Sequence, residues 1–168
     1  MKKLIIVTPQ KCLACKTCEL ACATEHSKTK KLDTAIKESP LPKKRIYVET
    51  ILEKNLNIPL QCRHCEDAPC VNICPTKALQ KQEYDIVQIN QDRCIGCKWC
   101  LQVCPFGVIM LDEKNKVIIK CDLCIERLKQ NQMPACVSSC PTGTLKIESI
   151  TDLQKDKRKN FLVEYTNK

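Results

Sequence analysis

Sixteen of the 168 residues are cysteines, and they fall into four groups of four along the chain. Thiolates are soft ligands for metal ions and iron–sulfur clusters, so cysteines gathered in this way indicate metal chemistry. The groups are Cys12, Cys15, Cys18 and Cys22 (group I); Cys62, Cys65, Cys70 and Cys74 (group II); Cys94, Cys97, Cys100 and Cys104 (group III); and Cys121, Cys124, Cys136 and Cys140 (group IV).

The spacing within groups I and III is that of the bacterial iron–sulfur run C-x2-C-x2-C-x3-C, and a proline follows the last cysteine of groups II, III and IV. Three cysteines at two-residue gaps wrap a loop around one face of a cubane, with the amide N–H groups of the loop pointing at the sulfides. The fourth cysteine lies where the chain turns away, so it ligates the cluster of the paired group. The spacing therefore predicts four [4Fe–4S] clusters.

Zinc sites and disulfides are the alternatives. A tetrahedral zinc site needs only two C-x2-C pairs and has no use for a third cysteine two residues further on. A chain that mixes zinc and iron–sulfur sites is the main alternative. A disulfide scaffold is disfavoured because Met1-Lys2-Lys3 is followed by only four apolar residues, too few for a secretory signal. We therefore expect the chain in the cytoplasm, where thiols stay reduced.

The remaining composition offers little else to hold a fold together. The hydrophobic fraction of 43% counts the cysteines, and without them about 33% is left, with only six aromatic residues. Such a chain buries too small an apolar core by itself, so we expect cluster binding to stabilise the fold. No apolar run reaches about 18 residues, which predicts that the chain has no transmembrane helix.

The formal net charge is +9 with neutral thiols, which by itself favours an anionic partner. Four cubanes, each with a 2+ core and four thiolates, would carry −2 apiece and bring the total to about +1. The lysines then balance cluster charge, and we expect no nucleic-acid partner.

Short elements are predicted around the cysteine groups. Apolar patterns predict strands at residues 2–8, 44–51, 84–90, 116–120 and 144–148. A short helix is predicted at residues 123–133, with Leu123 and Leu128 facing inward, while the polar residues 23–56 indicate a loop plus one strand. The order of strand, cysteine loop, helix and strand is thus repeated.

This repeat predicts an α+β fold of two fused bacterial-type 2[4Fe–4S] ferredoxin-like modules with short strands and helices. The inner module comprises residues 57–112, with groups II and III. The outer module combines residues 1–56 and 113–148, so groups I and IV must meet each other across the inner one. Residues 149–168 form a C-terminal helix, a candidate assembly element.

Three stretches of sequence resemble a known family. They are Gln61–Cys70 (QCRHCEDAPC), Cys94–Gly107 (CIGCKWCLQVCPFG) and the group IV motifs KCDLC, PACV and CPT between Lys120 and Thr142. They resemble the four-cluster ferredoxin-like subunits of molybdenum and tungsten oxidoreductases and hydrogenase complexes. Examples are the electron-transfer subunits of dimethyl sulfoxide reductase, formate dehydrogenase, formate hydrogenlyase and hydrogen-dependent carbon dioxide reductase, and the ferredoxin-like partner of carbon monoxide dehydrogenase. The resemblance covers residues 1–148.

In that family, groups I and IV share two clusters, and groups II and III share two more. The resemblance implies the following ligand sets: Cys12, Cys15, Cys18 and Cys140 for cluster 1; Cys22, Cys121, Cys124 and Cys136 for cluster 2; Cys62, Cys65, Cys70 and Cys104 for cluster 3; and Cys74, Cys94, Cys97 and Cys100 for cluster 4. Every cysteine is then used, and no iron keeps an open position for catalysis.

The resemblance implies a non-catalytic, polyferredoxin-like subunit that wires electrons between catalytic subunits in an anaerobic cell. Its expected partners are of the hydrogenase, carbon monoxide dehydrogenase or formate dehydrogenase type, or another molybdenum or tungsten oxidoreductase. The residues agree, since the sequence shows no nucleophile–base pair, Gly-rich phosphate loop or Rossmann fingerprint. The alternative is a free polyferredoxin acting as a diffusible carrier, but such carriers are usually strongly acidic and this chain is not.

His26, His64 and Trp99 lie near the cysteine groups. With four cysteines in every group, neither histidine is needed as a ligand. An N–H of His64 aimed at a sulfide would raise the reduction potential of that cluster, whereas the plainer interpretation is a packed side chain. Trp99 is interpreted as packing that excludes water from a cluster.

The chain ends in an amphipathic pattern. Five apolar residues share about half of the circumference of a helix, at 100° per residue: Ile150, Leu153, Phe161, Leu162 and Tyr165. Thr151 or Asp152 is expected to cap the start of this helix. Three outcomes stay open: the helix packs back on its own chain, frays, or docks onto a neighbouring subunit or another copy of a similar ferredoxin subunit.

Overall fold

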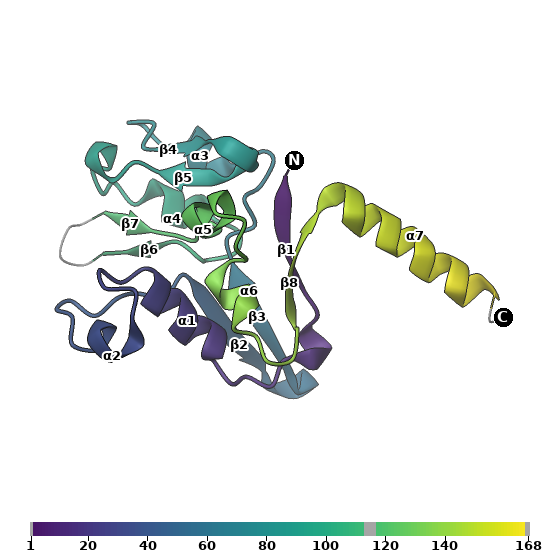
Figure 1. The fold of residues 1–168 in the computed structure, drawn as a ribbon. Helices are drawn as coiled ribbons and strands as arrows, with labels where there is room; N and C mark the ends of the chain where they lie inside the picture. The colour runs from purple at the N-terminus through teal and green to yellow at the C-terminus, as the bar shows by residue number, and fades with distance from the viewer. Residues whose placement is uncertain (1, 113–116, 167–168) are drawn as a thin grey trace.

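The computed structural model describes residues 2–112 and 117–166. Within these residues, the strands pair into four antiparallel sheets of two strands each (Figure 1). The pairs are β1 (Lys3–Val7) with β8 (Leu145–Ser149), β2 (Ile46–Ile51) with β3 (Leu56–Gln61), β4 (Leu79–Lys81) with β5 (Val87–Ile89), and β6 (Met110–Leu111) with β7 (Ile118–Ile119). The α+β fold class is confirmed.

Most of the described helices are short. They are α1 (Thr17–Glu25), α2 (Leu32–Ala35), α3 (Pro69–Asn72), α4 (Trp99–Val103), α5 (Ile125–Lys129), α6 (Ala135–Ser138) and α7 (Ile150–Thr166), with 3-10 turns at Pro9–Lys11, Leu52–Lys54, Glu83–Asp85 and Gln91–Arg93. Five of these helices, α1 and α3 to α6, lie within or directly after a cysteine group. α1 and α4 each start after a lysine in the left-handed conformation, Lys16 at φ 57° and Lys98 at φ 68°. That sharp turn puts the third cysteine of each group, Cys18 or Cys100, in the first turn of its helix. None of the helices described here is long and apolar enough to span a membrane.

The expected strands are present, four of them with tighter bounds and the one expected at residues 144–148 shifted by one residue to β8. At residues 84–90 the strand is limited to β5, because Tyr84 lies at φ 59° inside the 3-10 turn that precedes it. The strand expected at residues 116–120 corresponds to β7, and residue 116 itself lies outside the described residues. The module boundary expected between residues 112 and 113 also falls at the edge of the undescribed segment and stays a prediction.

The helix expected at residues 123–133 is shorter, and the apolar pattern does not predict β3. The helix is α5, and Leu123 and Leu128 are buried as predicted. In β3, Pro59 has the character of a strand breaker because it cannot donate to a ladder. A sheet of only two strands leaves each strand with an open edge, so a proline is tolerated there.

The interior consists of two apolar cores, and cysteines belong to both. The outer core includes Ile5, Ile46, Ile86, Leu123, Leu145, Cys18, Cys22 and Cys136. The inner core includes Ala68, Leu79, Val87, Ile109, Ile118 and Cys100. The outer core closes over a long sequence distance, because β1 pairs with β8 and α1 contacts α6. Groups I and IV therefore meet, as the sequence predicts.

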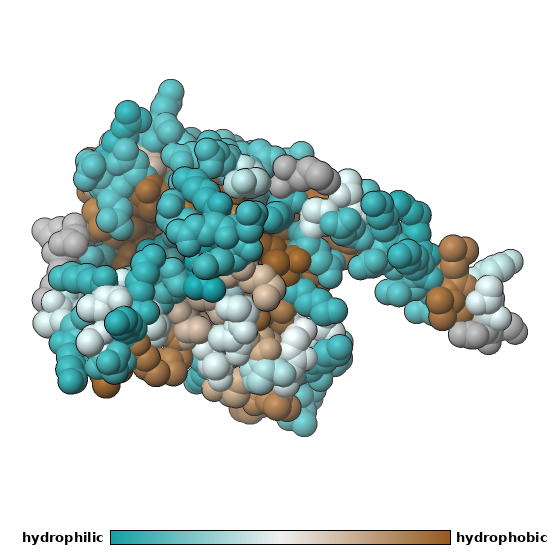
Figure 2. Space-filling model, viewed as in Figure 1, coloured by the Kyte–Doolittle hydropathy of each residue, from teal (hydrophilic) through white to brown (hydrophobic). Residues whose placement is uncertain are grey.

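The helix α7 leaves the body after β8 and projects away from it (Figure 1). None of its described residues is buried, and it contacts the body mainly at β8, so it does not pack back on its own chain. Its cap is Ser149, whose Oγ accepts the N–H of Asp152 at 3.1 Å, rather than Thr151 or Asp152. Phe161, Leu162, Val163 and Tyr165, near its far end, are exposed, and Figure 2 shows hydrophobic (brown) residues at this end of the helix.

We expect metal removal to unfold the chain, because cysteines are part of both apolar cores. Anaerobic chelation should abolish most of the far-ultraviolet circular dichroism together with the visible absorbance of the clusters. A parallel incubation without chelator is the control. A metal-free chain that keeps the native spectrum and unfolds cooperatively would contradict this expectation.

Candidate metal centres

All four C-x2-C loops share one backbone feature. The residue before the second cysteine has a positive φ in every loop: Ala14 (53°), His64 (46°), Gly96 (67°) and Leu123 (57°). Without a glycine, this conformation costs on the order of 1–3 kcal/mol, so the surrounding structure must impose it. It turns backbone N–H groups toward sulfur, with His64 N 3.5 Å from Cys62 Sγ and Leu123 N 3.4 Å from Cys121 Sγ. Such donors stabilise thiolates.

Two cavities in the inner half of the molecule are each lined by four cysteines. One is lined by Cys62, Cys65, Cys70 and Cys104, and the other by Cys74, Cys94, Cys97 and Cys100. Each quartet takes three cysteines from one group and the fourth from the other. The other lining residues are largely apolar and include Ile109 in the first cavity and Leu79 and Ile118 in the second.

The outer cysteines lie in a similar crossed pattern. Several group I thiols are close enough to group IV thiols to interact with them electrostatically: Cys15 and Cys18 with Cys140, and Cys22 with Cys121, Cys124 and Cys136. The contact between α1 and α6 brings these groups together. Cys22 thus lies near the first three cysteines of group IV, and Cys140 lies near Cys15 and Cys18 of group I.

The sulfurs are spread too widely for single zinc ions. Across the described residues, which include all sixteen cysteines, no three cysteine sulfurs lie within 4.8 Å of one another. A tetrahedral zinc site with Zn–S bonds of about 2.3 Å would hold its sulfurs about 3.8 Å apart. A cubane binds each cysteine through a different iron and separates the sulfurs further. The donor set and its spacing therefore fit [4Fe–4S] clusters better than zinc.

Burial raises the pKa of most inward-facing thiols. It raises the pKa of Cys22 to about 12 and that of Cys18 and Cys100 to about 11. It also lifts the pKa of Cys121 and Cys136 above the usual range. These thiols stay neutral at neutral pH unless a positive charge lies beside them. Metal binding must therefore displace their protons.

Cysteines in Cys-Pro-Thr sequences have a lowered pKa instead. Burial alone would raise the pKa of Cys140, but the backbone N–H of Leu145 and the Thr142 hydroxyl, 3.7 Å from Sγ, outweigh it. The same balance lowers the pKa of Cys74, which also precedes Pro-Thr. Hydrogen-bond donors thus favour the thiolate form of these two sulfurs.

Residues 54–150, more than half of the chain, match a family described as a 4Fe-4S dicluster domain. The chain belongs to the 4Fe-4S dicluster family. The matched range contains cysteine groups II, III and IV, and group I lies outside it. The expectation of [4Fe–4S] clusters is confirmed by this membership.

Three relatives match the dicluster protein along most of its length. It is 36% identical over 160 residues to the electron transport protein HydN of Escherichia coli, covering 86% of this chain and 87% of the relative. It is 37% identical over 138 residues to the thiosulfate reductase electron transfer subunit PhsB of Salmonella typhi (82% and 70%), and 32% identical over 161 residues to one chain of the anaerobic dimethyl sulfoxide reductase of Escherichia coli (89% and 74%). The chain is thus an iron–sulfur electron-transfer subunit and not itself an enzyme.

The side chains of His64 and Trp99 differ in their surroundings. His64 is buried, and its Nδ1 accepts the N–H of Val87 at 3.1 Å, which leaves the ring proton on Nε2. Burial and the nearby Lys120 ammonium lower the pKa of His64 to about 3, so the ring is neutral. Trp99 is 49% exposed at the start of α4, and its role in excluding water from a cluster stays a prediction.

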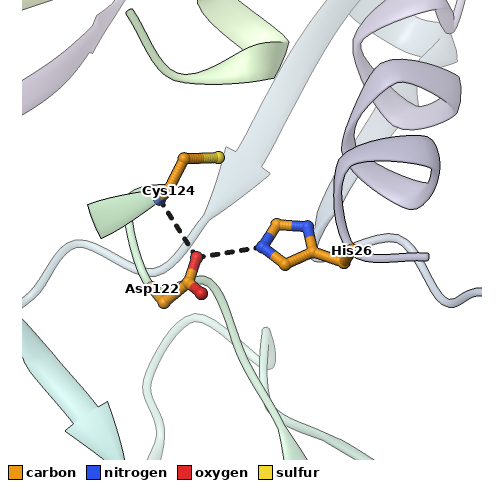
Figure 3. A group of neighbouring side chains, drawn as sticks. All are labelled: His26, Asp122 and Cys124. Carbon is orange, nitrogen blue, oxygen red and sulfur yellow. Dashed lines mark hydrogen bonds and ion pairs between the residues drawn. The ribbon is translucent and has the colours of Figure 1, made fainter. Parts of the chain in front are cut away.

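The Asp122 side chain connects three segments around the outer cysteines, and Figure 3 shows its contacts with His26 and Cys124. Its carboxylate accepts from His26 Nε2 at 3.1 Å, from Arg45 Nη1 at 2.7 Å and from the backbone N–H of Cys124 at 3.0 Å. Burial alone would raise the pKa of Asp122, but the His26 hydrogen bond and the Arg45 charge hold it well below its usual range. His26 also contacts the carbonyl oxygen of Cys22 at 2.7 Å, so these contacts join α1, the start of β2 and the group IV loop.

Nothing in the cysteine pattern singles out Asp122 or Arg45. Asp122 occupies an unspecified position of a C-x2-C loop, and Arg45 lies 77 residues earlier in the chain. Their pairing depends on how α1, β2 and the group IV loop pack together. The spacing of residues in the sequence therefore does not predict the pairing of Asp122 with Arg45.

Asp122→Asn should lower the apparent Tm of the cluster-loaded dicluster protein by roughly 3–8 °C, because it leaves the Arg45 charge without its partner. Anaerobic thermal unfolding followed by circular dichroism measures the change. Glu126→Gln is the matched control, since Glu126 is exposed and its ion pair among the described residues is with Lys129, at the surface. Equal small shifts in the two variants would contradict the role given to Asp122.

Proposed function

We propose that this protein carries electrons through four [4Fe–4S] clusters between two catalytic subunits. One partner is of the hydrogenase or carbon monoxide dehydrogenase type, and the other is a formate dehydrogenase or another molybdenum or tungsten oxidoreductase. The observation that carries this proposal is the crossing of groups II and III, whose eight cysteines line two cavities with four each, and groups I and IV supply the eight cysteines that two further clusters would need.

The proposed ligand sets follow the crossing. Cluster 1 takes Cys12, Cys15, Cys18 and Cys140; cluster 2 takes Cys22, Cys121, Cys124 and Cys136; cluster 3 takes Cys62, Cys65, Cys70 and Cys104; and cluster 4 takes Cys74, Cys94, Cys97 and Cys100. The two lined cavities support the inner sets, and the electrostatic neighbours of Cys22 and Cys140 support the outer ones.

Residues of the chain bind the clusters, shield them from water and offset their negative charge. When bound, each [4Fe–4S] cluster supplies one-electron transfer without proton chemistry. The thiolates fix it in place, the N–H groups of residues such as His64 and Leu123 offset negative charge, and the apolar linings exclude water. No side chain is required to move a proton.

Two of the four loops face solvent, which supports a path with two exits. Leu13 of group I is 72% exposed, and Ile95 at the same position of group III is 68% exposed. Each is followed by an exposed lysine, Lys16 or Lys98, directly after the second cysteine. At the position after the first cysteine of groups II and IV, Arg63 and Asp122 are only partly exposed. We therefore propose that partners dock at the group I and group III ends.

A free polyferredoxin is the second candidate, favoured only by the small size of the chain. The names of the relatives, which include an electron transfer subunit and a reductase chain, support the subunit interpretation instead. The net positive charge does not favour a diffusible carrier of the acidic kind. We place the protein in the cytoplasm, because sixteen thiols require a reducing compartment until they are loaded.

The exposed helix α7 is proposed to dock on a neighbouring subunit or on a further copy of a similar ferredoxin subunit. Phe161 and Tyr165 lie one turn apart with their ring centroids 6.1 Å from each other, and both are exposed. An aromatic pair held away from the body has no covering surface within the described residues. It is suited to insertion into an apolar groove of a partner.

Cys140→Ser should alter the cluster held by the first three cysteines of group I, because the fourth ligand is proposed to cross. Electron paramagnetic resonance of the reduced protein should show the same signal changed in Cys140→Ser and in Cys12→Ser. Cys124→Ser should change a different signal. If Cys140→Ser and Cys124→Ser change the same signal, the crossed pairing is wrong.

The unchanged chain is the reference for this comparison. Anaerobic metal analysis should find about 16 irons and 16 acid-labile sulfides per chain, four of each for every cubane. A value near 12 irons, or zinc in whole-number stoichiometry, would overturn the proposal of four clusters.

Deletion of residues 150–168 should leave all clusters in place while the native complex becomes smaller, because α7 carries no cysteine and projects from the body. Size-exclusion of anaerobic native extract measures this. Phe161→Asp should act in the same direction, whereas Leu52→Asp, exposed on the body, is the control. Elution of the unchanged protein as a single chain would end the subunit interpretation.

A further inference from the structure

The most deeply buried charged side chain of the described residues is Lys120, which is 2% exposed. It directly precedes Cys121, the first cysteine of group IV. Its ammonium donates to the backbone carbonyl of Cys121 at 2.7 Å and, in a very short contact, to the carbonyl of Val87. Both acceptors are neutral carbonyl groups, so the Lys120 ammonium has two hydrogen bonds but neither acceptor carries a negative charge.

At Lys120 the chain passes from the inner core to the outer core, and we call the boundary between the two cores the seam. Before it, Ile118 packs in the inner core, and after it, Leu123 packs in the outer core. Its acceptor Val87 belongs to the inner core, whereas the adjacent Ile86 belongs to the outer one. The ammonium is therefore held where the two halves of the molecule meet.

No carboxylate balances this charge. Among the described residues, no Asp or Glu oxygen lies within 4.0 Å of the Lys120 ammonium. Asp122 and Arg45 line the same cavity as Lys120, but Asp122 is engaged by Arg45 and His26. A buried cation without a counter-charge is costly, so the loaded protein must supply a negative charge nearby.

The proposed cluster sites supply that charge on both sides of the seam. Cys121, in the cluster 2 set, is the neighbouring residue, and Val87, whose carbonyl accepts from Lys120, lines the cavity of the cluster 3 set. A cubane with four thiolates carries −2 when oxidised and −3 when reduced. A fixed cation is attracted more strongly to the reduced form.

We propose that Lys120 is the shared counter-ion of the two central clusters and that it raises their reduction potentials above those of a neutral variant. This inference rests on the proposed function, since it takes its ligand sets from there. Lys120 is a positioning and tuning residue, not a ligand. It makes the middle of the path a favourable place for an electron that enters from either exposed end.

Lys120→Met in the full-length, cluster-loaded chain tests the inference, because methionine is also unbranched but has no charge. At a fixed solution potential, the ratio of reduced to oxidised protein should fall about tenfold for two of the four clusters, which is 59 mV for a one-electron couple. The other two clusters should not shift. Redox titration monitored by electron paramagnetic resonance measures all four, and Lys120→Arg should restore the potentials.

The control is Lys43→Met, since the Lys43 ammonium also donates to a backbone carbonyl, that of Leu111 at 3.4 Å, but is not held at the seam. It should leave every potential unchanged. A Lys120→Met protein with four clusters and unshifted potentials would overturn the inference and leave the proposed function intact. Fewer than four clusters in the unchanged chain would instead be a failure of the proposed function.

If the Lys120→Met protein loses clusters, the quantity to measure is the iron content per chain. The charge-retaining Lys120→Arg should then keep about 16 irons, while Lys120→Met and Lys120→Gln each lose about half of them. Equal loss in all three variants would show that the shape of the lysine side chain matters rather than its charge, and would overturn the inference.

Discussion

Burial of thiols is the constraint on which the rest of this dicluster protein depends. Burial raises the pKa of Cys22, Cys100 and Cys136, so these sulfurs become ligands only when a metal displaces their protons. The sheets are pairs of short strands, and both apolar cores include cysteines. Folding and metal binding therefore draw on the same buried surface.

Negative charge at the metal centres accounts for the way polar groups are distributed around them. Backbone N–H groups are turned inward by positive φ values that only Gly96, among the four loop residues concerned, adopts without cost. Asp122 holds three segments of the outer centre together through Arg45 and His26, and the excess of lysine over acidic residues offsets the thiolates. In the proposed arrangement, Lys120 is the innermost part of that compensation.

The same cysteine loop is used in two ways. In groups I and III the residue after the first cysteine, Leu13 or Ile95, is exposed, whereas at the same position of groups II and IV Arg63 and Asp122 are only partly exposed. In the proposed function, the two more exposed loops are the ends at which partners dock. The projecting α7 adds a further exposed surface that is separate from both ends (Figure 1).

The sequence by itself determined the metal chemistry, the α+β class and the approach of groups I and IV, because cysteine spacing acts locally and its pattern repeats. It also predicted the C-terminal helix and the burial of Leu128. Only the tertiary structure decided which loops face outward, where α7 projects and what surrounds Lys120. Lys120 follows a two-residue strand in an ordinary KCDLC motif, and its burial depends on Val87, 33 residues away. Such contacts between distant segments leave no periodic trace in the sequence, because each arises from the packing of one core against the other.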